Sequence, residues 1–151
     1  SPYFYMLESV VNFNSEVVPD YEDARKFLPN YIRRILETFF GFKYAQLSNN
    51  KGQTPGLPNF IFDIIDYDTI EDKTVGSITK ANLKSKLNSI NKICDNFSHG
   101  NMQQLDECNF ISDETLNEIA TDTLDIIEFF DTMHKEQIEE LVNPAIAEAT
   151  E

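Results

Sequence analysis

The sequence predicts an all-α protein, a helical bundle with three main amphipathic helices and shorter additional helices. Apolar side chains recur at three- and four-residue steps in three stretches, residues 28–40, 83–97 and 116–141. This spacing lines them up on one face of a helix, and three such faces can be buried against one another. At 151 residues the chain is long enough to enclose one complete core without a disulfide.

The first part of the chain combines an ambiguous opening with a clear helix. Residues 2–11 have the spacing of a short helix or a strand end, and a connection from there to Val18 leads into a strongly helical pattern over 20–44. Proline lacks an amide hydrogen and suits the first turn of a helix. We therefore expect a short helix that ends near Leu28 and a second helix that begins at Pro29.

The middle of the chain alternates loops with apolar segments. Gly, Pro and Asn are concentrated in residues 48–59, which we expect to form a surface loop. The short apolar run over 60–67 suits a helix or a strand, and we expect a helix. Residues 68–76 form a polar connection to an amphipathic helix over 78–97, with Gly100 as a natural stop after it.

A last long helix is predicted over residues 112–142. The Ser112 hydroxyl can cap its first turn, where Asp113 and Glu114 complement the positive end of the helix dipole, and Pro144 limits its far end. Its acidic side chains, Glu118, Asp122, Asp125 and Glu128, predict a solvated face or a docking face for a basic partner. Across the bundle, the side chains expected to be buried are Ile35, Leu87, Ile90, Ile127 and Phe130.

The net charge of −14 is distributed unevenly. Residues 1–92 carry eleven acidic and eleven basic side chains, whereas residues 93–151 carry fifteen acids against Lys135 alone. Phosphate would be repelled by the second part, so a nucleic-acid partner is expected only on the first part.

The two cysteines, Cys94 and Cys108, are too few for a disulfide framework and favour a reducing, cytoplasmic compartment. Cys94 lies on an apolar face and is most simply a small core residue. No segment is apolar enough for a membrane span, and the first residues lack the features of a secretory leader. No phosphate-binding or acyl-transfer motif is present, so no cofactor is expected.

Three segments carry a family resemblance: NYIRRILETFFGFKY at 30–44, INKICDNFSHG at 90–100 and TLDIIEFFDTMH at 123–134. Together they resemble the C-terminal region of large bacterial ATPases related to the anticodon nucleases PrrC and RloC. In that family an ABC-type ATPase domain is followed by a helical effector domain related to HEPN ribonucleases. The opening SPYFYML is similar to the segment that follows the switch histidine of such an ATPase.

The resemblance implies a division of the chain and a set of partners. Residues 1–18 would trail an ATPase core, and residues 19–151 would form the HEPN-like domain. It also implies a role in phage defence, an ABC-type ATPase partner in cis or in trans, a tRNA substrate and a homodimer.

The nuclease interpretation depends on Arg33, Glu37 and His99. Cutting RNA without a metal needs groups that move the protons of the 2′-hydroxyl and the leaving oxygen, and a cation that stabilises the crowded phosphate. His99 and Glu37 can share the proton transfers, and Arg33 can hold phosphate with two hydrogen bonds. The alternative for Arg33 and Glu37 is an ordinary ion pair on the helix surface. The alternative for His99 is a residue at a helix end that Gly100 caps.

The RNA itself is expected to cross Arg34, Lys80 and Lys84 in addition to Arg33. Lys80 and Lys84 lie one helical turn apart on the predicted helix over 78–97 and so share a face.

One departure from the family pattern favours a different function. HEPN ribonucleases commonly place an Arg five residues before the His, where this chain has Cys94. If that arginine is needed, the domain is a non-catalytic module for dimerisation or partner binding, unless Arg33 or Arg34 reaches the site across the bundle. A second polar pair, His134 with Asp131, is expected to be structural.

Overall fold

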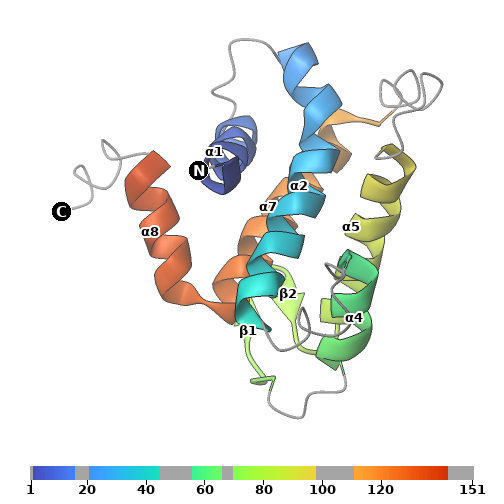
Figure 1. The fold of residues 1–151 in the computed structure, drawn as a ribbon, viewed down its shortest axis with the longest axis vertical. Helices are drawn as coiled ribbons and strands as arrows, with labels where there is room; N and C mark the ends of the chain where they lie inside the picture. Colours follow the sequence, from blue (N-terminus) through green and yellow to red (C-terminus); the bar gives the residue numbers. More distant parts are fainter. Residues whose placement is uncertain (1, 16–20, 45–55, 66–69, 98–110, 143–151) are drawn as a thin grey trace.

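Helices form where the apolar periodicity predicts them, and the all-α bundle is confirmed. The computed structural model describes residues 2–15, 21–44, 56–65, 70–97 and 111–142, which hold six helices and one short antiparallel hairpin. With the labels of Figure 1, the elements are α1 (Pro2–Asn14), α2 (Tyr21–Lys43), α4 (Leu57–Ile65), β1 (Thr74–Val75), β2 (Ile78–Thr79), α5 (Leu83–Phe97), α7 (Asp113–Phe130) and α8 (Thr132–Val142).

The long helix α2 lies at the centre of the bundle. It packs against α1 on one side and against α4 and α5 on the other, and α7 lies behind it (Figure 1). Its apolar stripe is buried along most of its length because these neighbours cover it from several directions. The buried apolar side chains of α2 are Leu28, Ile32, Ile35, Leu36, Phe39 and Phe40.

The break predicted at Pro29 is wrong, because α2 continues through this proline as one helix of 23 residues. A proline inside a helix removes one backbone hydrogen bond and costs roughly 3 kcal/mol. Here Pro29 is buried, and Leu28 and Ile32 on either side of it are also buried. Continuing the helix keeps both of these side chains on the stripe that faces the core, which offsets the cost.

The opening segment is a helix, and it belongs to the core. Leu7, Val10 and Phe13 of α1 are completely buried, and α1 contacts α2, α7 and α8. The chain division predicted at residue 18 stays a prediction, but residues 2–14 pack as part of the same bundle as the rest.

The predicted polar connection over 68–76 and the predicted start of a helix at residue 78 need correction. β1 and β2 pair there as a hairpin whose turn is Gly76 and Ser77. Gly76 has a φ of 58°, which the tight turns that suit hairpin twist require at this position. A side chain at this position would also clash with the carboxylate of Asp125.

The helix α5 begins five residues later than predicted, after a turn that a polar exchange between Thr79 and Asn82 holds together. The Asn82 side chain accepts a hydrogen bond from the Thr79 backbone N–H (2.8 Å), and the Thr79 hydroxyl accepts one from the Asn82 backbone N–H (3.1 Å). Such caps satisfy amides that have no partner inside the helix.

The predicted helix over 112–142 is two helices. Ser112 caps α7 as predicted and accepts a hydrogen bond from the Thr115 backbone N–H (3.1 Å). At Asp131 the backbone leaves the helical conformation, and the Asp131 carboxylate then caps α8 by accepting from the His134 backbone N–H (3.0 Å). Aspartate is a strong capping residue, so its side chain stabilises the break between α7 and α8.

Most of the predicted core is buried, with one exception. Ile35, Leu87, Ile90 and Ile127 are at most 1% exposed, whereas Phe130 is only half-buried, because α7 ends there. The helix expected over 60–67 is confirmed as α4, which begins at Leu57, inside the predicted loop over 48–59. The rest of that loop up to residue 55 lies outside the described residues.

Two neighbouring aromatic residues test the packing of α2. Phe40 is fully buried against the rings of Phe39, Tyr44, Phe60 and Phe130, whereas Phe42 is 81% exposed. Phe40→Ala should lower the free energy of unfolding by about 3 to 5 kcal/mol, since it leaves a cavity. Phe42→Ala should change it by less than about 0.5 kcal/mol. Urea unfolding followed by circular dichroism measures both, and equal losses would contradict the packing described.

Candidate functional site

Arg33 and Glu37 form the predicted pair on α2. The Arg33 Nε lies 3.5 Å from the Glu37 Oε1, and both side chains are about three-quarters buried. The Arg33 Nη2 also donates to the Asn30 Oδ1 (3.1 Å). The Nε hydrogen has no hydrogen-bond partner among the described residues, because 3.5 Å to Glu37 is too long for one. One buried donor of Arg33 therefore remains available within the described part of the chain.

The helix α5 runs antiparallel to α2 and brings Cys94 to this pair (Figure 1). The Cys94 thiol is completely buried, and this burial raises its pKa to about 12. The charge and a backbone hydrogen bond of Arg33 lower that pKa, and the charges of Asp95 and Glu37 raise it. Residues that are far apart in sequence, on α2 and α5, thus meet here.

Cys94 is the position five residues before His99 at which the family pattern has an arginine. The charge of Arg33, on the neighbouring helix α2, acts on this position. His99 itself lies outside the described residues.

Arg34 is exposed and borders a groove next to the pair. The groove has a volume of about 280 Å³ and is lined by Arg34, Glu37, Thr38, Gly41 and Phe42, all of α2. Glu37 therefore faces the Arg33 guanidinium on one side and an open groove on the other.

The two predicted RNA-contacting lysines lie elsewhere. Lys80 is in the turn before α5 and Lys84 is in the first turn of α5. The prediction that both lie on one face of the same helix is therefore wrong. Both are exposed. Lys84 precedes Cys94 by ten residues of one helix, which corresponds to roughly 15 Å along its axis. The structure does not bring these lysines to Arg33.

His134 is held by aromatic side chains. Its Nε2 lies 2.9 Å from the Tyr3 hydroxyl, and its ring stacks on those of Tyr3 and Phe39 with centroids 5.8 and 5.9 Å away. The predicted partner Asp131 bonds the backbone N–H of His134 and not its ring. Burial raises the pKa of the Tyr3 phenol, and the charge of Asp131 raises it further, so Tyr3 stays neutral.

A hollow opens beside this histidine, and the sequence analysis did not find it. It has a volume of about 360 Å³ and lies between α1, the end of α2 and the start of α8. Tyr3 and His134 are 131 residues apart, so no spacing rule connects them. The side chains that line the hollow include Tyr3, Phe4, Phe39, Phe42, Lys43 and His134.

Two acidic residues of α7 hold the hairpin in place instead of forming a solvated face. Asp122 is buried, accepts a hydrogen bond from the Ser77 hydroxyl (2.9 Å) and pairs with Lys86 (3.4 Å). Burial raises the pKa of Asp125, while a hydrogen bond from the Ser77 backbone lowers it. The predicted solvated acidic face is therefore wrong for Asp122, whereas Glu118 is exposed.

Comparisons with protein-family models, with curated proteins and with solved structures found no match. In the described ranges, no helix has both the length and the apolar character to cross a membrane. No three His, Cys, Asp or Glu side chains of the described residues lie close enough to hold a metal ion together.

The chemistry of Cys94 provides a test of how the pair is packed. With a thiol pKa of about 12, only about one thiol in 10⁴ is ionised at pH 8, and the thiolate is the reactive form. In a Cys108→Ser chain, Cys94 should resist a disulfide reagent such as DTNB while folded and should react completely in urea. Rapid stoichiometric labelling of the folded chain would contradict the burial of Cys94.

Proposed function

We propose that this chain is a helical effector domain of a bacterial phage-defence ATPase, and that it cuts tRNA-like RNA in the cytoplasm without a metal ion. One observation carries the proposal. Arg33, paired with Glu37 on α2, acts electrostatically on Cys94 of the adjacent helix α5, at the position where the family pattern commonly has an arginine. An ABC-type ATPase domain, in cis or in trans, would couple this site to nucleotide hydrolysis.

His99 completes the proposed site. It follows Phe97, the last residue of α5, by two positions in the sequence. Phe97 is itself less than one helical turn beyond Cys94.

The three side chains have separate roles in the cut. Glu37 takes the proton of the 2′-hydroxyl, the 2′-oxygen bonds to phosphorus, and the bond from phosphorus to the 5′-oxygen breaks. His99 gives its proton to the departing 5′-oxygen. Arg33 donates hydrogen bonds to the phosphate oxygens, on which negative charge accumulates. The products are a 2′,3′-cyclic phosphate end and a 5′-hydroxyl end.

Cleavage of a tRNA substrate with the ATPase partner present tests this site. The cut should persist in excess EDTA and leave a 2′,3′-cyclic phosphate. Arg33→Ala and His99→Ala should each lower the rate about 10²- to 10⁴-fold, since each removes transition-state stabilisation or a proton transfer. Lys92→Ala, which removes an exposed cation of α5, is the matched control and should cut normally. Full activity in both Arg33→Ala and His99→Ala would reject the ribonuclease.

A second candidate function, a non-catalytic dimerisation module, is favoured by exposed aromatic side chains. Tyr5 of α1 is 62% exposed and Phe27 of α2 is 54% exposed, and both rings lie 6.1 Å from the ring of Tyr31. The helix α1 lies between α8 and α2 (Figure 1), and Glu136 of α8 and Arg34 of α2 are both exposed. A two-fold axis along the direction of α2 and α8 would place α8 of one copy, which carries Glu136, over α2 of the other copy, which carries Arg34.

Sedimentation velocity tests whether the chain forms this homodimer. A homodimer formed through the aromatic face should dissociate more easily, with a Kd raised at least about tenfold, in Tyr5→Ala and Phe27→Ala, because aromatic anchors dominate the binding energy of interfaces. Phe62→Ala on α4 removes an equally exposed ring from another helix and should leave the Kd unchanged. A monomer at every concentration would eliminate the dimer.

A further inference from the structure

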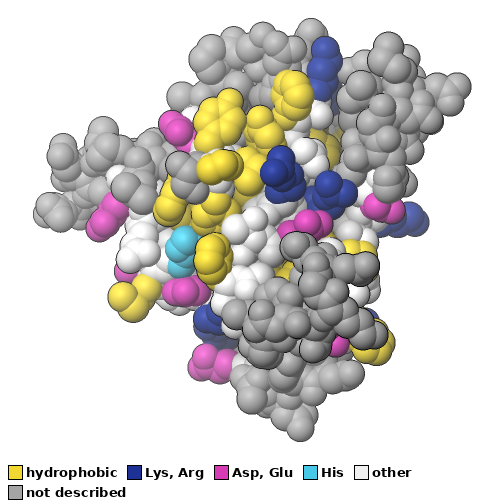
Figure 2. Space-filling view, in the orientation of Figure 1, with side chains coloured by type: hydrophobic (Ala, Val, Ile, Leu, Met, Phe, Trp, Pro, Cys, Tyr) yellow, Lys and Arg dark blue, Asp and Glu magenta, His cyan; other side chains and the backbone are white. Residues whose placement is uncertain are grey.

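The hollow beside His134 adjoins the groove beside Glu37. Both are lined by Phe42, so the two depressions meet at this one exposed ring. Phe4, on the opposite wall of the hollow, is 40% exposed. In Figure 2 hydrophobic side chains gather on this face next to the histidine. Flat aromatic surfaces that remain open to solvent suit a ligand that stacks.

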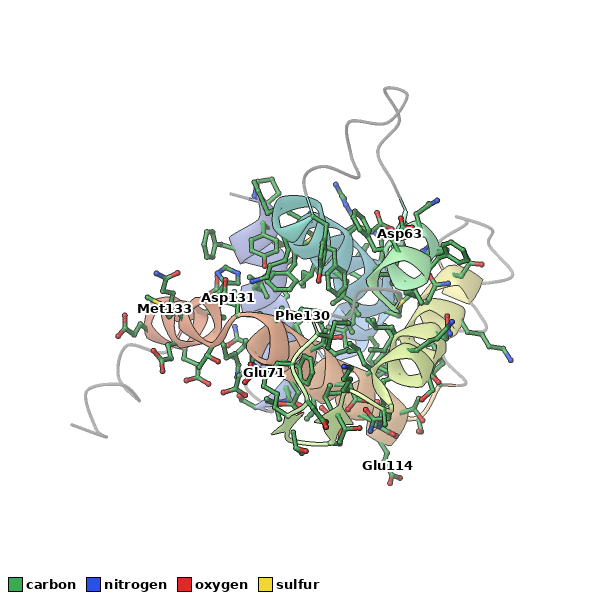
Figure 3. The ribbon with its side chains drawn as sticks, turned by 90° about the horizontal axis from the view of Figure 1, so that it is seen from below. Asp63, Glu71, Glu114, Phe130, Asp131 and Met133 are labelled. Atoms are coloured by element: carbon green, nitrogen blue, oxygen red, sulfur yellow. The ribbon has the colours of Figure 1, made fainter. Side chains whose placement is uncertain are left out.

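The floor of the hollow supplies polar groups of fixed position. The Tyr3 hydroxyl is held against the His134 Nε2 at 2.9 Å. One oxygen of Asp131, at the junction of α7 and α8 (Figure 3), is bonded to the His134 backbone, which leaves the other oxygen to accept from a ligand. An aromatic slot with a few oriented polar groups is typical of sites for planar heterocycles.

Two cations of α2 border these depressions, Arg34 at the groove and Lys43 at the hollow. Arg34 forms no ion pair with the described residues, whereas the neighbouring Arg33 is paired with Glu37. Lys43 donates one hydrogen bond to the Phe130 carbonyl (3.0 Å), which leaves two of its three donors. Nine residues separate Arg34 from Lys43 on one helix, roughly 13 Å along its axis and half a turn around it. Lys43 is therefore the cation next to Phe42, where it can meet a phosphate beside a stacked ring.

We propose that the hollow between α1, α2 and α8 holds one unpaired base of the RNA substrate, stacked on Phe42, with a neighbouring phosphate on Lys43. This inference rests on the proposed ribonuclease, since the Arg34 groove leads directly to Glu37. The bound base would fix which phosphate reaches Arg33. The hollow thus determines where along the RNA the cut falls.

Binding of an RNA that cannot be cut separates the base site from catalysis. The probe is a fluorescent single-stranded 2′-O-methyl RNA of eight nucleotides, either intact or with one abasic position moved along it. Its blocked 2′-oxygen cannot attack phosphorus. Fluorescence anisotropy with the 151-residue chain should show one position whose abasic form binds about tenfold more weakly. In Phe42→Ala that difference should disappear, whereas Phe62→Ala should keep it.

Lys43→Ala tests the phosphate contact independently. It should weaken binding of the intact and abasic probes by the same factor. It should also reduce the slope of log affinity against log salt concentration by about one, since one fewer counterion is released. Lys92→Ala should do neither. The base site is overturned if no probe binds, if every abasic form binds like the intact probe, or if Phe42→Ala matches Phe62→Ala. It is also overturned if Phe42→Ala breaks a dimer in sedimentation while RNA affinity stays the same.

The same measurements tell the two proposals apart. A base-dependent affinity that requires Phe42, together with full cleavage by Arg33→Ala, would keep the base site and reject the nuclease site. Cleavage that requires Arg33, together with the same affinity for the intact probe and for every abasic probe, would keep the nuclease site and reject the base site.

Discussion

The continuity of α2 through Pro29 is the constraint on which the rest of the structure depends. A proline inside a helix costs roughly 3 kcal/mol through the lost hydrogen bond and the clash of its ring, whereas each apolar side chain fully buried contributes about 1.5 to 3 kcal/mol. The six buried side chains of this helix therefore outweigh the proline. A break at Pro29 would have let Arg33 and Arg34 point independently of Arg25. The unbroken helix instead sets Arg33, Arg34 and Lys43 at fixed spacings on one rigid element.

The apolar periodicity predicted the helices but not their ends. Stripes of buried side chains reflect the 3.6-residue period of a helix, and this is why α2, α5 and α7 were predictable. A helix end depends instead on one polar side chain that reaches a free amide, as Ser112 and Asp131 do. Ser112 was found because it follows this rule, and the same rule applied to Asp131 would have separated α7 from α8.

In the candidate site, too, the contact within one helix was predictable and the contacts between helices were not. The pairing of Arg33 with Glu37 follows from their four-residue spacing, which local helix geometry fixes. Their electrostatic effect on Cys94 depends on the antiparallel packing of α5 on α2, and the meeting of Tyr3 with His134 depends on the packing of α1 against α8. Such contacts arise from tertiary structure, so no single segment encodes them. The burial of Asp122 was missed because its partner, Ser77, lies on a hairpin that was not predicted.

The distribution of charge makes RNA binding by this acidic chain physically consistent. At about 0.15 M salt, charges more than roughly 8 Å apart are largely screened from one another. The exposed glutamates of α8 next to the hollow, such as Glu136, then oppose a phosphate there, whereas the buried Asp122 is already paired with Lys86. The attraction for a strand on α2 comes chiefly from Arg34 and Lys43. At low salt the net charge of −14 would oppose that binding over a longer range. The affinity for RNA should therefore rise less, when the salt concentration is lowered, than counterion release alone predicts.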